Sequence, residues 1–362
     1  MRTRWLSVVA LVTLLVTVGA GVALSRVERG APTVPTALDS MPAETLTASV
    51  TDWSRVRALL DAGGDSGDAA DADALLDRAY ETDASAVSVL GDRAPVMERA
   101  YGWSVLDAEW EALAQSRQGA AVIVQMPPEY DLGTVRERLG ELGYLEPFEA
   151  DGVWRGGADL LAGIDSSLTP LMGHAVVLDD SNRVVFSDRA VYAERTARVI
   201  GGSVGSLAQT EAAGAVAEAM QGAVAGVVHA GQQGCAVMGF ERASGGDREL
   251  ARQRVASVGG VTPYSAVGLA LTPGPDGRMS RPPLTVAMHF DDTGAAVEEE
   301  AQRRAALAVG EAPGQGGTYG QRFAVSSAQQ RGGDVVLRLR PREIDAQLLS
   351  DLNAGELLFA GC

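Results

Sequence analysis

The chain has 362 residues and a formal net charge of −17, with 47 acidic against 30 basic residues. It contains no lysine, and its arginines form no cluster in the sequence that would interrupt the acidic pattern, so nucleic acid is not an expected partner. Hydrophobic residues make up 46% of the chain, which is enough for a sizeable core.

The N-terminal segment 1–29 predicts passage into or across a membrane. Arg2 and Arg4 precede the uncharged run Trp5 to Leu24. About 20 apolar residues suit a transmembrane helix, and the preceding arginines would hold the N-terminus in the cytoplasm. A cleaved signal peptide is the alternative, because small residues around Ala23 offer a cleavage site. Either interpretation exports the rest of the chain, which carries −20 because these 29 residues carry +3.

The segment 30–42 contains three prolines among small residues and predicts an extended spacer behind the membrane segment. Thr45 to Thr51 is typical of a strand, and Asp52 can cap a helix after it. The acidic stretch Asp61 to Asp77 does not match the ligand spacing of a calcium loop, so it predicts a solvated loop.

Leu106, Trp110 and Leu113 recur at helical spacing within residues 84–117, which therefore predict a helix with core aromatics. A strand over Gly119 to Met126 should follow it.

In the middle of the chain, capping residues mark where helices begin. Asp131 precedes a periodic helix that ends at Gly143, and Asp188 is expected to cap the helix after a hairpin over 175–187. Ser206 and Gln209 form a capping-box pattern, and a buried strand follows them over 223–229.

The last third is expected to continue with helices and strands of the same kind. The predicted elements are a helix over 247–258, strands over 264–271 and 284–290, a helix over 293–309, a hairpin over 322–339, a helix containing Ile344, Leu348 and Leu352, and a terminal strand over 356–360.

These elements predict an α+β fold of mostly antiparallel sheets, with helices packed mainly on one face, behind an N-terminal transmembrane helix. The hairpin, helices and strand ending near Cys235 resemble the hairpin, helix and strand ending at Cys362. We therefore expect two distantly similar halves, over residues 43–240 and 241–362.

The two cysteines are expected to form a disulfide between Cys235 and Cys362, because two cysteines in an exported chain usually pair. A metal site built from both cysteines and His229 is the alternative. It lacks the closely spaced ligands that are typical of zinc sites.

Catalytic motifs are weak. Residues 201–205 match the G-x-S-x-G pattern of a nucleophile elbow around Ser203, with His229 or His289 as possible bases. The elbow requires a strand before the serine, whereas the preceding residues predict a helix, so the glycines are better explained as a helix end.

No cofactor is expected. The glycine-rich segment 314–320 lacks the residue order of a phosphate-binding loop, and Asp291 with Asp292 is explained by helix capping.

The chain also resembles a family of uncharacterised exported or membrane-anchored proteins of high-GC Gram-positive bacteria. The resemblance rests on residues 41–45, 50–53, 156–160, 309–317 and 358–362. It implies an exported domain of unknown function behind one membrane anchor, and it implies no activity.

We therefore expect a membrane-anchored, extracytoplasmic, non-enzymatic module that binds an unknown protein. Two alternatives remain open: binding of an apolar ligand such as a lipid, and a cell-surface serine hydrolase that uses Ser203.

Overall fold

The structure, a computed structural model, describes residues 34–60, 69–344 and 346–362. The expected membrane segment Trp5 to Leu24 lies outside these residues, as does the acidic stretch up to Asp68. Among the residues that are described, no helix has both the length and the apolar character needed to cross a bilayer. Thr33–Cys362 is one compact unit, and no division falls at the expected boundary between residues 240 and 241.

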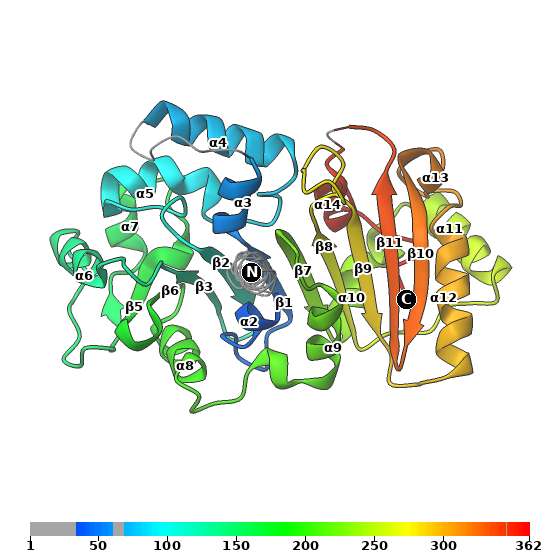
Figure 1. The fold of residues 1–362 in the computed structure, drawn as a ribbon. Coiled ribbons are helices and arrows are strands. Elements are labelled where there is room, and N and C mark those ends of the chain that lie inside the picture. The colour runs from blue at the N-terminus through cyan, green and yellow to red at the C-terminus, as the bar shows by residue number, and fades with distance from the viewer. Residues whose placement is uncertain (1–33, 61–68, 345) are drawn as a thin grey trace, which may run out of the picture. The chain divides into compact units, whose positions relative to one another are not determined.

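One continuous antiparallel sheet of eleven strands runs through the described part of the chain (Figure 1). Its order is β10-β11-β9-β8-β7-β1-β2-β3-β6-β5-β4, which places the first strand at the centre. The strands are β1 Thr47–Thr51, β2 Trp110–Gln115, β3 Ala120–Gln125, β4 Trp154–Arg155, β5 His174–Leu178, β6 Arg183–Ser187, β7 Ala225–Ala230, β8 Ala266–Leu271, β9 Leu284–His289, β10 Phe323–Arg331 and β11 Asp334–Pro341. The predicted α+β class with a mostly antiparallel sheet is therefore confirmed.

Thirteen α-helices surround the sheet in the same described ranges. They are α2 Val34–Leu38, α3 Trp53–Leu59, α4 Ala69–Glu81, α5 Ala94–Tyr101, α6 Leu132–Glu141, α7 Ala158–Ile164, α8 Ala190–Ile200, α9 Glu211–Ala219, α10 Gln232–Met238, α11 Gly245–Ser257, α12 Ala295–Leu307, α13 Tyr319–Arg322 and α14 Leu348–Ala354.

The sheet separates two hydrophobic cores, because successive residues of a strand point to opposite faces. Val227 and its neighbour Val228, both on β7, belong to different cores. We call face A the side of the larger core, which α3 to α7 and α10 to α14 cover. Face B is the side of the smaller core, which α2, α8 and α9 cover. Helices thus lie on both faces, with most of them on face A.

The strand order repeats on the two sides of the sheet centre. From the centre outward, β1-β2-β3-β6-β5 on one side corresponds to β7-β8-β9-β11-β10 on the other, and β1 pairs with β7. The expected repeat instead ended each half with a strand leading to a cysteine. That prediction is wrong in the second half, because residues 356–360 form turns and irregular backbone.

The expected spacer is wrong for residues 34–41. Val34–Leu38 is helix α2, and the side chains of Val34, Leu38 and Met41 are buried in the core of face B. The prolines start and flank this short helix, because proline is tolerated in a first helical turn. The segment therefore belongs to the folded body.

The helix expected over residues 84–117 is present only as α5, Ala94–Tyr101, and is wrong on both sides of it. Trp110–Gln115 is strand β2, in which Trp110 packs on face B and Leu113 on face A. The three-residue spacing between them is compatible with helix and strand alike, and pairing with β1 and β3 decides in favour of the strand.

Two further local predictions need correction. The expected acidic loop is helix α4 from Ala69 onward, with Leu75 and Ala79 buried. Asp188 does not cap α8, because its Oδ1 instead accepts the backbone N–H of Ala120 at 2.9 Å.

Candidate interaction surface

Ser203 lies in the turn that follows α8 and is exposed. A helix and not a strand leads into Gly201, so the backbone does not build a nucleophile elbow. Across the described residues, the Ser203 hydroxyl forms no hydrogen bond to a histidine, and its backbone N–H is donated to the carbonyl of Arg198 at 2.9 Å. The structure therefore does not bring Ser203 together with its expected bases.

The two histidines proposed as bases lie on opposite faces of the sheet. His229 is buried on β7, where its Nδ1 lies 3.1 Å from Oγ1 of Thr47, and burial lowers the pKa of His229 to about 4. His289 lies at the end of β9, where its Nδ1 is 2.7 Å from Oδ1 of Asp334. Each histidine is thus held by a neighbouring strand.

The predicted disulfide is present: Cys235 on α10 and Cys362 are bonded, and their Cα atoms are 5.2 Å apart. In the part of the chain that is described, no group of histidine, cysteine and carboxylate side chains could hold a metal ion.

Arg304 of α12 fixes the C-terminal segment beside this disulfide. Its fully buried guanidinium donates to the carbonyls of Gly361 at 2.6 Å and Phe359 at 3.2 Å, and to Oε1 of Glu300 at 2.7 Å. Burial lowers the pKa of Arg304, which the Glu300 carboxylate opposes. This cluster stabilises the fold and is closed to solvent.

The C-terminal hairpin β10–β11 differs from this buried cluster, because its arginine side chains are exposed to solvent. Side chains on face B of the hairpin form what we call the arginine face. It consists of Ala324, Ser327, Gln329 and Arg331 on β10 and Asp334, Val336, Arg338 and Arg340 on β11. The three arginines are exposed.

The charge of this hairpin is opposite to that of the chain. Residues 322–342 contain five arginines and one aspartate, a net charge of +4, which leaves −21 for the other residues. The expectation that no basic cluster exists is therefore wrong in three dimensions. The arginines are separated in the sequence, and the pairing of β10 with β11 places Arg331 on the same face as Arg338 and Arg340.

These arginines lack acidic partners within the described structure. Arg331 donates to Oε1 of Gln329 at 3.3 Å, and Arg338 donates to Oγ1 of Thr285 at 3.4 Å. Arg340 makes no hydrogen bond or ion pair there, and none of the three is in a salt bridge with a described carboxylate. By contrast, Arg322 at the base of the hairpin is paired with Asp351. The arginine face therefore keeps its charge available.

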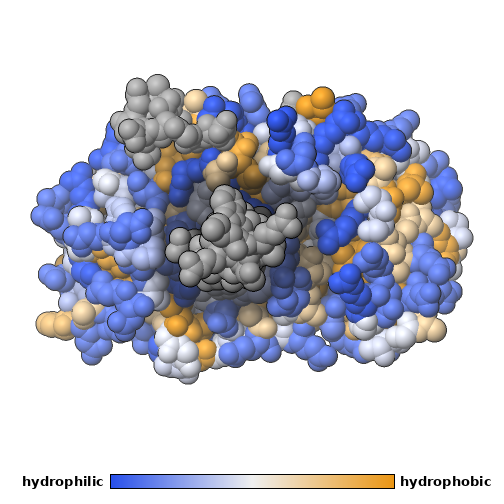
Figure 2. All heavy atoms as spheres, viewed as in Figure 1, coloured by the Kyte–Doolittle hydropathy of each residue, from blue (hydrophilic) through white to orange (hydrophobic). Residues whose placement is uncertain are grey.

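The strand repeat explains why this face is open. Helix α8 follows the hairpin β5–β6 and packs back onto its face B, where it buries Tyr192 and Ala193. Helix α14 follows the equivalent hairpin β10–β11, but its Leu348, Leu349 and Leu352 join the core of face A. On face B, α9 contacts β11 where Val336 is buried, and in Figure 1 no described helix stands in front of β10. Figure 2 shows hydrophilic and hydrophobic atoms mixed over this region.

No protein-family model and no curated protein matches the chain. Two solved structures are similar at low scores. Crystal form I of TP0453 has a TM-score of 0.33 and 7% identity, covering 87% of this chain and 97% of that chain. Crystal form III of TP0453 has a TM-score of 0.37 and 7% identity, covering 88% and 97%. At these scores the similarity supports no conclusion about function.

Proposed function

We propose that the chain is a membrane-anchored, extracytoplasmic interaction module that binds an acidic segment of a protein partner on its arginine face. In this proposal the segment Trp5 to Leu24 is the anchor, and the module is not an enzyme. The observation that carries it is the row of three exposed arginines without carboxylate partners, on a sheet face whose counterpart is covered by a helix.

The chemistry of the face favours carboxylates. Arginine presents a planar fork of donors that matches a carboxylate with two parallel hydrogen bonds. Arg338 and Arg340 lie two residues apart on one strand, which places their Cα atoms about 7 Å apart. Carboxylates four residues apart on a helix have a similar spacing of about 6 Å. A partner helix with acidic residues at this spacing could therefore occupy the position that α8 occupies on the other side.

The negative charge of the rest of the chain restricts which partners can bind the arginine face. The rest of the chain carries −21 and repels a long polyanion such as nucleic acid. A short acidic segment of a protein needs to contact only the arginine face. The negative charge around the arginine face therefore favours a partner whose own negative charge is confined to a short segment.

A binding titration tests the proposal. Full-length protein in detergent micelles is titrated against a fluorescent helical peptide that carries glutamates four residues apart, and binding is followed by fluorescence anisotropy. We expect saturable binding that the variant R331E/R338E/R340E weakens by at least about tenfold, because like charges then face each other. The matched control R242E/R248E/R252E changes the net charge equally at exposed positions of η5 (Phe240–Arg242) and α11, and it should bind as the wild type does. Equal weakening in both variants would contradict a local docking surface.

A further inference from the structure

We propose that the acidic segment is the loop 145–152 of a second copy of this chain, so that molecules associate head to tail. This inference rests on the proposed function and names its partner. It comes from the loop's exposed apolar side chains and its charge, and from its position at the far end of the sheet.

Loop 145–152 connects α6 to β4 and carries two of the most exposed large apolar side chains in the described structure. The relative exposure is 70% for Leu145 and 109% for Phe148. The backbone around them is nevertheless fixed. Leu145 and Arg155 exchange N–H···O bonds of 2.8 and 3.1 Å, and the Gly152 N–H donates to the carbonyl of Glu149 at 3.0 Å. An exposed phenylalanine on an ordered loop is a feature of interaction surfaces.

The charges of the loop complement the arginine face. Glu146, Glu149 and Asp151 are exposed and have no ion pair or side-chain hydrogen bond with any residue the structure describes. Three unpaired carboxylates on one surface thus match three unpaired arginines on the other. Phe148 between them could lie against an arginine guanidinium, which binds the face of an aromatic ring.

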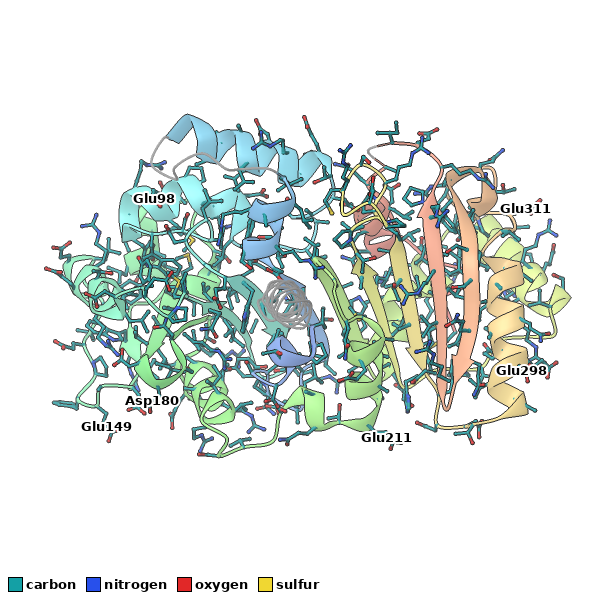
Figure 3. All side chains as sticks on the ribbon, in the orientation of Figure 1. Glu98, Glu149, Asp180, Glu211, Glu298 and Glu311 are labelled. Atoms are coloured by element: carbon teal, nitrogen blue, oxygen red, sulfur yellow. A yellow bond between two sulfur atoms is a disulfide. The ribbon has the colours of Figure 1, made fainter. Side chains whose placement is uncertain are left out.

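The two surfaces are at opposite ends of the sheet and cannot meet within one molecule. β10 is one edge strand and β4 is the other, which is ten strand spacings, or about 48 Å, away. In Figure 3, Glu149 lies at the side opposite to Glu298, which is on α12, and Glu311, which follows α12. Contact between the loop and the arginine face must therefore join two molecules.

The sign of the charges also excludes a two-fold dimer through either surface. Two arginine faces repel each other, and so do two copies of loop 145–152. Only the contact of unlike surfaces is attractive. In the head-to-tail arrangement each contact joins one loop to one arginine face and leaves one free surface of each kind at the ends, so further copies can repeat it.

A charge-swap experiment tests this inference on the full-length protein in detergent micelles, with sedimentation velocity over a range of protein concentrations. We expect the average mass of the wild type to rise with concentration. The variants E146R/E149R/D151R and R331E/R338E/R340E should each weaken self-association by at least about tenfold. The chain that carries both sets of changes should recover it, because the charges are again complementary. Circular dichroism verifies that every variant is folded.

Phe148→Ala is a separate test of the apolar contact and should weaken self-association by roughly tenfold. A wild type that stays monomeric, or a combined variant that fails to recover association, would overturn the inference. These outcomes are distinguishable from failure of the proposed function. If only the inference fails, the arginine variant still loses binding of the acidic helical peptide, whereas the loop variant has no effect on it.

Discussion

Nδ1 of His289 lies 2.7 Å from Oδ1 of Asp334, so the one carboxylate of the C-terminal hairpin is engaged by a histidine of the neighbouring strand. Asp334 is also the cross-strand neighbour of Arg331, yet the two form no salt bridge. The hairpin therefore keeps an excess of positive charge at the surface where we place the partner.

Replacing the Asp334 carboxylate should strengthen binding of the acidic helical peptide. Asp334→Asn removes a negative charge from the edge of the arginine face, and asparagine can still hydrogen-bond to His289. We expect the affinity for the acidic helical peptide to rise about two- to fivefold, in line with the energy of a single exposed charge pair. Asp276→Asn, in the loop between β8 and β9, is the control and should leave the anisotropy titration unchanged.

The buried pair of Glu300 and Arg304 should matter for stability. Arg304→Met removes the donor to Gly361 and leaves the buried Glu300 carboxylate with only Arg303, 3.8 Å away, as a cationic partner, so the free energy of unfolding should fall by about 3 to 5 kcal/mol. The double variant with Glu300→Gln should recover part of this loss, because a neutral amide replaces the buried carboxylate that has lost its closest cation. Urea denaturation measures both. A double variant no more stable than Arg304→Met would show that charge pairing is not the cause.

The disulfide between Cys235 and Cys362 should also stabilise the C-terminal segment that Arg304 holds. It closes a loop with a sequence separation of 127, and the chain-entropy model sets its stabilisation at up to about 5 kcal/mol. Cys235→Ser with Cys362→Ser should therefore lower the urea midpoint, and dithiothreitol should lower the wild-type midpoint but not that of the variant. A reductant effect on the variant would mean that the change does not come from this bond.

Burial of His229 should make the protein sensitive to acid. Its pKa falls from 6.5 to about 4 on folding, chiefly because burial penalises the charged ring. Below pH 6.5 the unfolded chain therefore binds a proton that the folded chain refuses, and this contribution to stability is lost as the pH falls toward 4. At pH 5 the loss should be about 2 kcal/mol relative to pH 7. His229→Gln should remove this part of the pH dependence in urea denaturation. If the free energy of unfolding of this variant depends on pH as that of the wild type does, His229 is not the source of the acid sensitivity.

Local capping rules predicted several helix starts from the sequence alone. Asp131 caps α6 by accepting the N–H of Gly133 at 2.8 Å, and Ser206 with Gln209 forms a capping box on the 3-10 turn Leu207–Gln209, which precedes α9. The hairpins over 175–187 and 322–339 were also predictable, because each consists of two β-prone runs around a short turn. These features depend on residues close in sequence.

Features that depend on distant residues could not be predicted in this way. Asp83 accepts the backbone N–H of Ser350, at the start of α14, at 3.1 Å from 267 residues away. Trp110 lies in a strand because β1 and β3 flank it. The arginine face exists only after the pairing of β10 with β11 places Arg331, opposite Asp334, on the same side of the hairpin as Arg338 and Arg340. The sequence contains all residues of the arginine face. It does not show that they share one face of the sheet, or that no described helix covers Arg338 and Arg340.

Photo-crosslinking in native membranes tests the central proposal most directly. A photoreactive residue replaces Ser327 on the arginine face or, as a control, Ala256 on α11, and mass spectrometry maps the adducts. We predict adducts at Ser327 with an acidic protein segment, which disappear when Arg338→Glu and Arg340→Glu are added. Adducts no more frequent than at Ala256, or adducts that persist after charge reversal, would contradict a docking role for the arginine face.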